Sequence, residues 1–389
     1  MSQYGDYQNE LYLAALGGVL PQHPFTYDDL ERGGLEVLPP ELRSYVAGGS
    51  GSEATQRANA EAFGRWALVP RMLRGAAERD LSVELFGKRL ASPLMLAPVG
   101  VVGLCTPDGH GDIATAQVAA QTGVPMIAST LMNDPLEDVV PHSGDTPAWF
   151  QLYTPKSREL AASLVSRAER AGYDAIVVTL DTWVPGWRPR DLASGNFPQL
   201  RGKVLANYTS DPVFQEMTGP DPDLGTVVLT WVSTFGNPLS WDDLPWLRSL
   251  TTLPIVLKGI CHPDDARRAL DAGVDGIYCS NHGGRQADGG GSALGWLPGV
   301  VDAVAGQAPV IFDSGVRTGA DVVKAIALGA TAVAVGRPYV YGLALGGVPG
   351  AVHVLRSLQA EADLVMAVDG YPTLADLDRD ALVWQGANR

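Results

Sequence analysis

The sequence predicts an α/β fold, a closed (β/α)8 barrel with an N-terminal helical extension and a long insert, and two observations carry this prediction. Eight short apolar segments recur from residue 94 onward, and most are separated by stretches with helical spacing that end in glycine. Strands alternating with helices form parallel sheets, and eight such units close into a TIM barrel. An open, doubly wound sheet is the alternative.

The eight expected strands are rich in β-branched residues and too short to be buried helices. They are LMLAPV (94–99), PMIAS (125–129), AWFQLY (148–153), AIVVTL (175–180), PIVLKG (254–259), GIYCSN (276–281), PVIFDSG (309–315) and TAVAVG (331–336). We expect a single domain over residues 1–389, in which the barrel occupies 91–370 and a tail follows over 371–389.

Two regions depart from the barrel rhythm. Within residues 1–90, LPPELRSYVAGGSGSEATQRANAEAFGRWAL predicts two helices around a glycine-rich break, and LSVELFGKRLASP predicts a hairpin around Gly87. Residues 181–253 form an insert between the fourth and fifth strands. A connection of this length is typical of a lid or a wall of a site, and a mobile surface excursion is the alternative.

Composition narrows the class of protein. The net charge is -15 and no Lys/Arg run occurs, which argues against nucleic acid and anionic membranes as partners. No apolar stretch is long enough for a membrane span, and the polar N-terminus is unlike a signal peptide. The 3 cysteines are widely spaced without a CxxC motif, so neither a disulfide framework nor a metal site is expected. We expect a cytoplasmic protein.

Polar residues follow nearly every expected strand, at the end of the barrel where active sites lie. These strand ends carry Pro98, Val99 and Gly100; Ser129; Gln151 and Tyr153; Thr179 and Asp181; Lys258; Ser280 and His282; Asp313, Gly315 and Arg317; and Gly336 and Arg337. In a barrel without a ligand, only turn-forming residues would be needed at these positions. The sequence therefore predicts a ligand site there.

The last two strand ends read DSGVRTG and GRP, and they predict a phosphate site. Glycines allow close backbone approach, helix N-termini favour anions, and Arg317 and Arg337 add charge. Lys258 is either a Schiff-base nucleophile, a fixed charge near a cofactor or a snorkelling side chain. His282, among glycines and followed by Arg285, is placed to act as a base on a ligand.

These motifs resemble a known family. SNHGGRQ (280–286), with LKG one strand earlier and DSGVRTGADVVKAIALGA and GRP after it, resembles the FMN-dependent L-2-hydroxy-acid oxidases over almost the whole chain. Within that family, GDYQNELY, GDTPAWFQLY, GWRPRDL, DPVFQ and EADLVMAVDGY resemble the actinobacterial lactate 2-monooxygenases. The resemblance implies FMN as cofactor, a small 2-hydroxy acid and O2 as substrates, and a homo-oligomer, tetrameric or octameric.

The resemblance also implies roles for individual residues. His282 corresponds to the catalytic base, Asp181 to its supporting carboxylate, and Arg188 with Arg285 to the clamp on the substrate carboxylate. Tyr45 and Tyr153 correspond to tyrosines near the substrate carboxylate and hydroxyl, so that Tyr153 and Arg285 also serve catalysis. Leu131 corresponds to a residue near the substrate side chain, where an aliphatic group suits lactate. Cofactor contacts correspond to Pro98, Val99, Gly100, Ser129, Gln151, Thr179, Lys258, Ser280, Asp313, Gly315, Arg317, Gly336 and Arg337.

The insert departs from the monooxygenase pattern, because the segment after DPVFQ is shorter than its counterpart there. Three functions are thus weighed. A lactate 2-monooxygenase retains pyruvate, which peroxide decarboxylates to acetate, CO2 and water. An oxidase releases the keto acid and H2O2, on lactate or a larger substrate. A flavin-binding barrel without turnover is the third, which the intact His282, Arg285, Arg188 and Lys258 disfavour.

Overall fold

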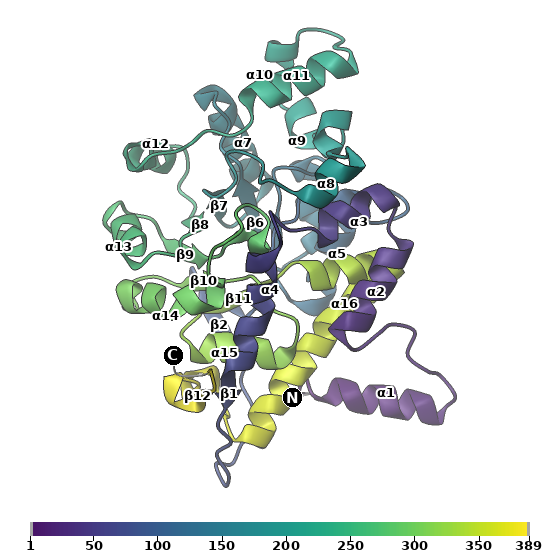
Figure 1. Cartoon of the computed structure of the whole chain (residues 1–389), viewed down its shortest axis with the longest axis vertical. Helices are drawn as coiled ribbons and strands as arrows, with labels where there is room; N and C mark the ends of the chain where they lie inside the picture. The colour runs from purple at the N-terminus through teal and green to yellow at the C-terminus, as the bar shows by residue number, and fades with distance from the viewer. Residues whose placement is uncertain (1–2, 387–389) are drawn as a thin grey trace.

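The computed structural model describes residues 3–386, and its centre is a closed barrel of eight parallel strands (Figure 1). The strands follow one another around the barrel in chain order, each within a predicted segment. They are β4 (Leu94–Leu96), β5 (Met126–Ala128), β6 (Ala148–Leu152), β7 (Ile176–Thr179), β8 (Ile255–Lys258), β9 (Gly276–Cys279), β10 (Val310–Phe312) and β11 (Ala332–Val335). The TIM-barrel prediction is confirmed, and the open-sheet alternative is wrong.

Helices surround the barrel as the glycine-terminated segments predict. They include α5 (Gly111–Thr122), α7 (Arg158–Ala171), α13 (Pro263–Asp271), α14 (Ala293–Val304), α15 (Gly319–Ala327) and the long α16 (Arg337–Asp369). The side chain of Ser157 caps the start of α7, and Gly172, with φ of 97°, ends it. Thr318 and Asp321 form a capping box that starts α15 directly after β10.

The barrel interior is a packed core that a hairpin closes at its N-terminal end. Side chains from alternate strand positions, such as Met95 and Ile311, form one cluster with Leu85 and Leu90 of the hairpin. The hairpin joins β2 (Val83–Leu85) to β3 (Lys88–Leu90), as predicted around Gly87. Ligands are therefore confined to the opposite, C-terminal end.

The described part of the N-terminal extension contains four α-helices and the 3-10 helix η1 (Ala62–Arg65). The predicted pair, α3 (Pro40–Ala47) and α4 (Ala54–Glu61), flanks the glycine-rich break, and α1 (Asp6–Leu16) and α2 (Tyr27–Val37) precede it without having been predicted. The Asp288 carboxylate, in the loop after β9, accepts hydrogen bonds from the backbone N–H groups of Ser52 and Thr55. The break is thereby attached to the site end of the barrel.

The insert is folded into short helices, which Figure 1 shows in the upper half of the view. These are α8 (Pro189–Ser194), the 3-10 helix η4 (Pro198–Arg201), α9 (Ala206–Thr209), α10 (Pro212–Thr218), α11 (Leu224–Thr234), the 3-10 helix η5 (Trp241–Asp243) and α12 (Leu244–Ser249). Asp211 and Asp223 cap α10 and α11 with their side chains. The side chains of Phe214 and Trp231 are buried within the insert.

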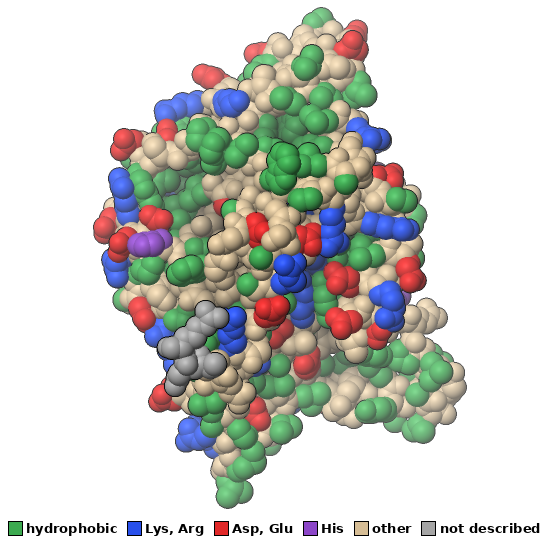
Figure 2. All heavy atoms as spheres, in the orientation of Figure 1, with side chains coloured by type: hydrophobic (Ala, Val, Ile, Leu, Met, Phe, Trp, Pro, Cys, Tyr) green, Lys and Arg blue, Asp and Glu red, His purple; other side chains and the backbone are tan. Residues whose placement is uncertain are grey.

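The C-terminal tail pairs with the segment that follows α4. Strand β1 (Trp66–Leu68) pairs antiparallel with β12 (Leu382–Trp384), so the predicted tail forms a strand, and its residues 387–389 lie outside the described part. None of the helices within residues 3–386 has the length and apolarity to cross a bilayer. Figure 2 shows hydrophobic side chains gathered on the outer face of the insert and along α1.

Candidate active site

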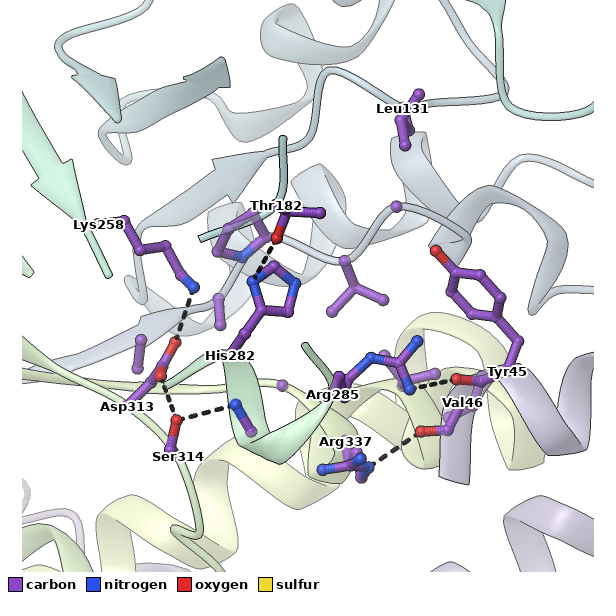
Figure 3. Close-up of a pocket in the computed structure, with 18 of the residues that line it drawn as sticks. Tyr45, Val46, Leu131, Thr182, Lys258, His282, Arg285, Asp313, Ser314 and Arg337 are labelled. Atoms are coloured by element: carbon purple, nitrogen blue, oxygen red, sulfur yellow. Dashed lines mark hydrogen bonds and ion pairs between the residues drawn. The ribbon is translucent and has the colours of Figure 1, made fainter. Parts of the chain in front are cut away.

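A cavity of about 1100 Å³, part of which opens to solvent, lies at the C-terminal end of the barrel (Figure 3). All eight strand ends contribute to its wall, together with α3 and the insert. The predicted site residues that line it are Tyr45, Pro98, Val99, Gly100, Leu131, Tyr153, Arg188, Lys258, His282, Arg285, Asp313, Gly315, Arg317, Gly336 and Arg337. The remaining predicted site residues are not part of this wall; they are Asp181, Ser129, Gln151, Thr179 and Ser280.

His282 is held against a carboxylate behind it. Its Nδ1 lies 2.8 Å from Asp181 Oδ1 and 3.1 Å from the hydroxyl of Thr182, which itself donates to Asp181. The ring therefore turns its other nitrogen away from these two partners. His282 also has a φ of 57°, a left-handed conformation that is uncommon for a residue other than glycine and that concentrates at functional sites.

The charges around His282 set the protonation of the pair. Burial lowers the pKa of His282 below its ordinary value, and Lys258 adds to this effect, while Asp181 opposes it. Burial alone would raise the pKa of Asp181, but the charges of His282 and Lys258 outweigh it and lower that pKa to about 2. At neutral pH the site thus presents an ionised carboxylate behind a neutral imidazole.

Lys258 is buried at the floor of the cavity, with 3% of its surface exposed. Its Nζ donates to Ser280 Oγ at 3.1 Å and lies 3.8 Å from an Asp313 carboxylate oxygen. Ser280 Oγ also accepts a hydrogen bond from the backbone N–H of His282. These contacts hold an ammonium in place and rule out a snorkelling side chain.

A buried polar chain supports the wall beside Gly100 and Leu131. Gln151 Nε2 donates to Thr179 Oγ1 at 2.9 Å, while Ser129 Oγ donates to Gln151 Oε1 at 3.2 Å. Ser129 Oγ in turn accepts from the backbone N–H of Leu131 at 3.1 Å. Three of the predicted cofactor residues thus form a network that fixes this wall.

Two guanidinium groups converge beside Tyr45. Their Cζ atoms lie 4.8 Å (Arg285) and 5.5 Å (Arg188) from the centre of the Tyr45 ring. Arg285 donates to the backbone carbonyls of Tyr45 and Gly48, and Arg188 Nε donates to the carbonyl of Arg285. Burial and the charge of Arg188 lower the pKa of Arg285 to about 9. Crowded cations of this kind favour an anion between them.

A second cationic group lies where β10 and β11 end. Arg337 is the first residue of α16, and its guanidinium donates to the carbonyl of Val46 at 2.9 Å and to Gln56 Oε1 at 2.7 Å. Burial and the nearby charge of Arg317 lower the pKa of Arg337. A helix N-terminus and two arginines together make a site for a phosphate.

The sequence reasoning missed the aromatic side chains that the insert contributes. Phe197, Trp231 and Phe235 line the cavity and connect Tyr45 to Tyr153 in a continuous series, which we call the aromatic arc. Ring centres are 6.4 Å apart for Tyr45–Phe197, 6.5 Å for Phe197–Trp231, 4.9 Å for Trp231–Phe235 and 5.5 Å for Phe235–Tyr153. The four-residue spacing of Trp231 and Phe235, which places both on one helix face, was the available signal.

Other lining residues were also missed. Thr182 touches His282, and the Ser314 hydroxyl accepts from the backbone N–H of Gly283 at 3.0 Å. Gln199 of η4 lines the cavity as well. Among the described residues that form the wall, five are Lys or Arg and one, Asp313, is a carboxylate. The cavity is therefore cationic within a protein of net charge -15.

The chain matches a family and several of its members over most of its length. Residues 35–384 match the family described as FMN-dependent dehydrogenase. The FMN-dependent alpha-hydroxy acid dehydrogenase of Penicillium citrinum is 44% identical over 386 residues, covering 97% of this chain and 96% of that protein. The L-lactate oxidase of Lysinibacillus sphaericus is 41% identical, covering 92% and 93%.

Solved structures agree with this match. A lactate oxidase of Pediococcus acidilactici superposes with a TM-score of 0.84 at 36% identity, covering 93% of this chain and 95% of that one. A mandelate oxidase in complex with benzoyl-formic acid has a TM-score of 0.81 at 37% identity, covering 92% and 98%.

The charges and the shape of the cavity fit FMN. The cationic group of Arg317 and Arg337, which would suit the FMN phosphate, lies at one part of the cavity, and the buried ammonium of Lys258 lies at another. At Gly336 the nearest atoms to an added Cβ would be 3.9 Å away, so the backbone is open toward the cavity. The chain belongs to the family of FMN-dependent dehydrogenases, and FMN is its cofactor.

Proposed function

We propose that this oxidoreductase converts a short L-2-hydroxy acid to the keto acid and retains that product while O2 reacts, so that L-lactate gives acetate, CO2 and water. The single observation that carries this proposal is the aromatic arc, because it closes the substrate side of the cavity with residues of the insert. The names of the relatives support the 2-hydroxy acid, since they include lactate oxidases and an alpha-hydroxy acid dehydrogenase.

In this proposal Arg188 and Arg285 bind the substrate carboxylate, and the ring of Tyr45 packs against both guanidinium groups at the cavity wall. Tyr153 lies at the opposite end of the aromatic arc, near the substrate hydroxyl. A carboxylate held by two guanidinium groups has a fixed orientation, which directs the substrate Cα–H toward the flavin. FMN supplies the oxidising power by accepting two electrons from that carbon.

His282 accepts a proton from the substrate through the nitrogen that does not face Asp181. The proton comes either from the hydroxyl or from Cα, and both routes leave an imidazolium. Asp181 lies 2.8 Å from the ring and stabilises that imidazolium electrostatically. Lys258 places a fixed positive charge beside the flavin, where reduction brings negative charge.

The pH profile of the reaction tests the role of His282. Only the neutral imidazole accepts a proton, and its pKa is lowered, so we expect kcat/KM to reach its plateau from an acid limb centred below about pH 6.5. Since Asp181 raises the pKa of His282, Asp181→Asn should move the limb to lower pH and reduce the plateau. Asp242→Asn, an exposed change in the insert, should leave both unchanged. A limb that moves to higher pH in Asp181→Asn would contradict the assignment.

Product analysis tests the proposed function. We expect L-lactate to bleach the flavin of the purified holoenzyme without oxygen, and air then to yield acetate and CO2 in place of H2O2. Phe235→Ala opens the aromatic arc and should shift the products toward pyruvate and H2O2, because the keto acid leaves sooner. Leu229→Ala, on the exposed face of α11, is the matched control. If no 2-hydroxy acid bleached the flavin, the proposal would be refuted.

The second candidate is an oxidase that releases the keto acid and H2O2. The similarity to proteins named lactate oxidase and mandelate oxidase favours it. Stoichiometric pyruvate and H2O2 from the unmodified protein would establish this outcome and exclude the monooxygenase. A flavin-binding barrel without turnover is disfavoured by the paired His282 and Asp181.

Three further features belong to the same proposal. We propose a single domain over residues 1–389, because the extension, the barrel and the insert all border one cavity. The exposed apolar residues of α1, Tyr12, Leu13 and Leu16, support a homo-oligomer. A cytoplasmic location stays a prediction from the polar N-terminal sequence.

A further inference from the structure

Gln199 is a buried carboxamide in the cavity wall whose hydrogen-bonding groups have no partner. Its side chain is 0% exposed, it lines the cavity from η4, and neither Oε1 nor Nε2 contacts a donor or acceptor. Buried amides are almost always paired, because they lose their hydrogen bonds to water on folding. An unpaired donor and acceptor at a cavity wall therefore point to a ligand.

No side chain within residues 3–386 forms a hydrogen bond with the Gln199 carboxamide. The neighbouring insert residues on the wall are the aromatic side chains of Phe197, Trp231 and Phe235. The Trp231 indole N–H and the Tyr208 hydroxyl are also buried without a hydrogen-bond partner, and Tyr208 does not line the cavity. Gln199 thus adds an uncharged hydrogen-bonding side chain to the insert's part of the wall, which also includes Arg188 and Thr182.

The position of Gln199 separates it from the groups that bind the invariant parts of a 2-hydroxy acid. Arg188 and Arg285 are placed for the carboxylate, and His282 is placed for the proton that is removed. Figure 3 shows the His282 ring, Tyr45 and Leu131 around one common space. Leu131 and the aromatic arc enclose the remaining part of that space, which the substrate side chain would occupy.

We infer that Gln199 is a specificity-determining residue that recognises a hydrogen-bonding group at the end of the substrate side chain. A group that both donates and accepts satisfies both amide atoms, as a hydroxyl or a carboxamide does. A carboxylate would leave Oε1 unpaired, and an ammonium would leave Nε2 unpaired. The preferred substrate is an L-2-hydroxy acid with a hydroxyl or carboxamide on its side chain. This inference rests on the proposed oxidation of 2-hydroxy acids.

Two pairs of nearly isosteric substrates test the inference on the unmodified holoenzyme. L-Glycerate is paired with L-2-hydroxybutyrate, and the 4-amide of L-malate is paired with L-2-hydroxy-4-methylpentanoate. The rate of flavin bleaching under anaerobic conditions gives kcat/KM for each acid. We expect the polar member of at least one pair to be favoured by about tenfold or more, because the apolar member leaves the buried amide unpaired.

Variants of Gln199 assign the preference to its side chain. Gln199→Leu and Gln199→Met should lose most of the tenfold preference, chiefly by slowing the polar substrate. Gln215→Leu, an exposed change on α10, should keep it. Loss of the absorbance of bound FMN would show that a variant has failed to fold. If one of the two variants fails in this way, the other still allows the comparison.

The outcomes separate the inference from the proposed function. Apolar members favoured in both pairs, or variants that slow polar and apolar substrates equally, would overturn the role of Gln199 while keeping the oxidation. No bleaching by any 2-hydroxy acid would overturn the proposed function itself, and the inference would fall with it.

Discussion

Replacing His282 by alanine is expected to slow flavin reduction by about 10²- to 10⁴-fold, the usual contribution of a positioned general base. The reason is geometric, since His282 is the imidazole on the cavity wall and Asp181 holds its Nδ1 at 2.8 Å. Anaerobic stopped-flow measurement of flavin bleaching by L-lactate checks the rate directly. A variant that bleaches at the normal rate would refute the role.

The backbone at His282 requires a second variant. Its φ of 57° disfavours alanine more than asparagine, which tolerates left-handed conformations. His282→Asn should therefore keep the local fold and show the same loss of rate. His142→Ala, at an exposed position in the chain, is the matched control and should retain full activity.

Replacing Arg285 by methionine is expected to lower kcat/KM by about 30-fold to several thousandfold, equivalent to roughly 2–5 kcal/mol for removing one partner of a buried charged contact. Methionine fills much of the same space but cannot bind a carboxylate. Steady-state kinetics with L-lactate should show the loss, and circular dichroism with FMN absorbance should show that the fold persists.

The fold is not expected to depend strongly on the charge of Arg285. Burial and Arg188 lower its pKa to about 9, so the folded protein disfavours this cation when no anion is bound. Arg190→Met removes an exposed arginine paired with Glu53 and should leave kcat/KM unchanged. An unaltered KM and kcat in Arg285→Met would show that the carboxylate binds elsewhere.

The barrel was predictable because its signal is local. Each strand is a short buried run, and the helices between strands carry their own caps and terminal glycines, as Gly172 shows for α7. The polar strand ends follow from the same register, which is why His282, Lys258 and Arg337 were found before the structure. Parallel strands in a closed barrel bring their ends together whatever their separation in sequence.

The insert was harder to predict because its structure depends on contacts distant in sequence. Helix α11 has Trp231 as one of its few buried residues, and α11 packs against η4 and α10, which are separate segments of the insert. Sequence also could not show which polar residues face the cavity. Gln151 and Thr179 lie at strand ends, yet their side chains bond to each other behind the wall.

The pairing of β1 with β12 has a practical consequence for handling this protein. Trp66 and Trp384 stack edge to face at 4.9 Å, so the last strand holds the segment that follows α4. That segment continues back to the glycine-rich break and Tyr45. A shortened C-terminus that lacks β12 would loosen one wall of a pocket far from the cut. An affinity tag is therefore better added beyond residue 386 than exchanged for the residues before it.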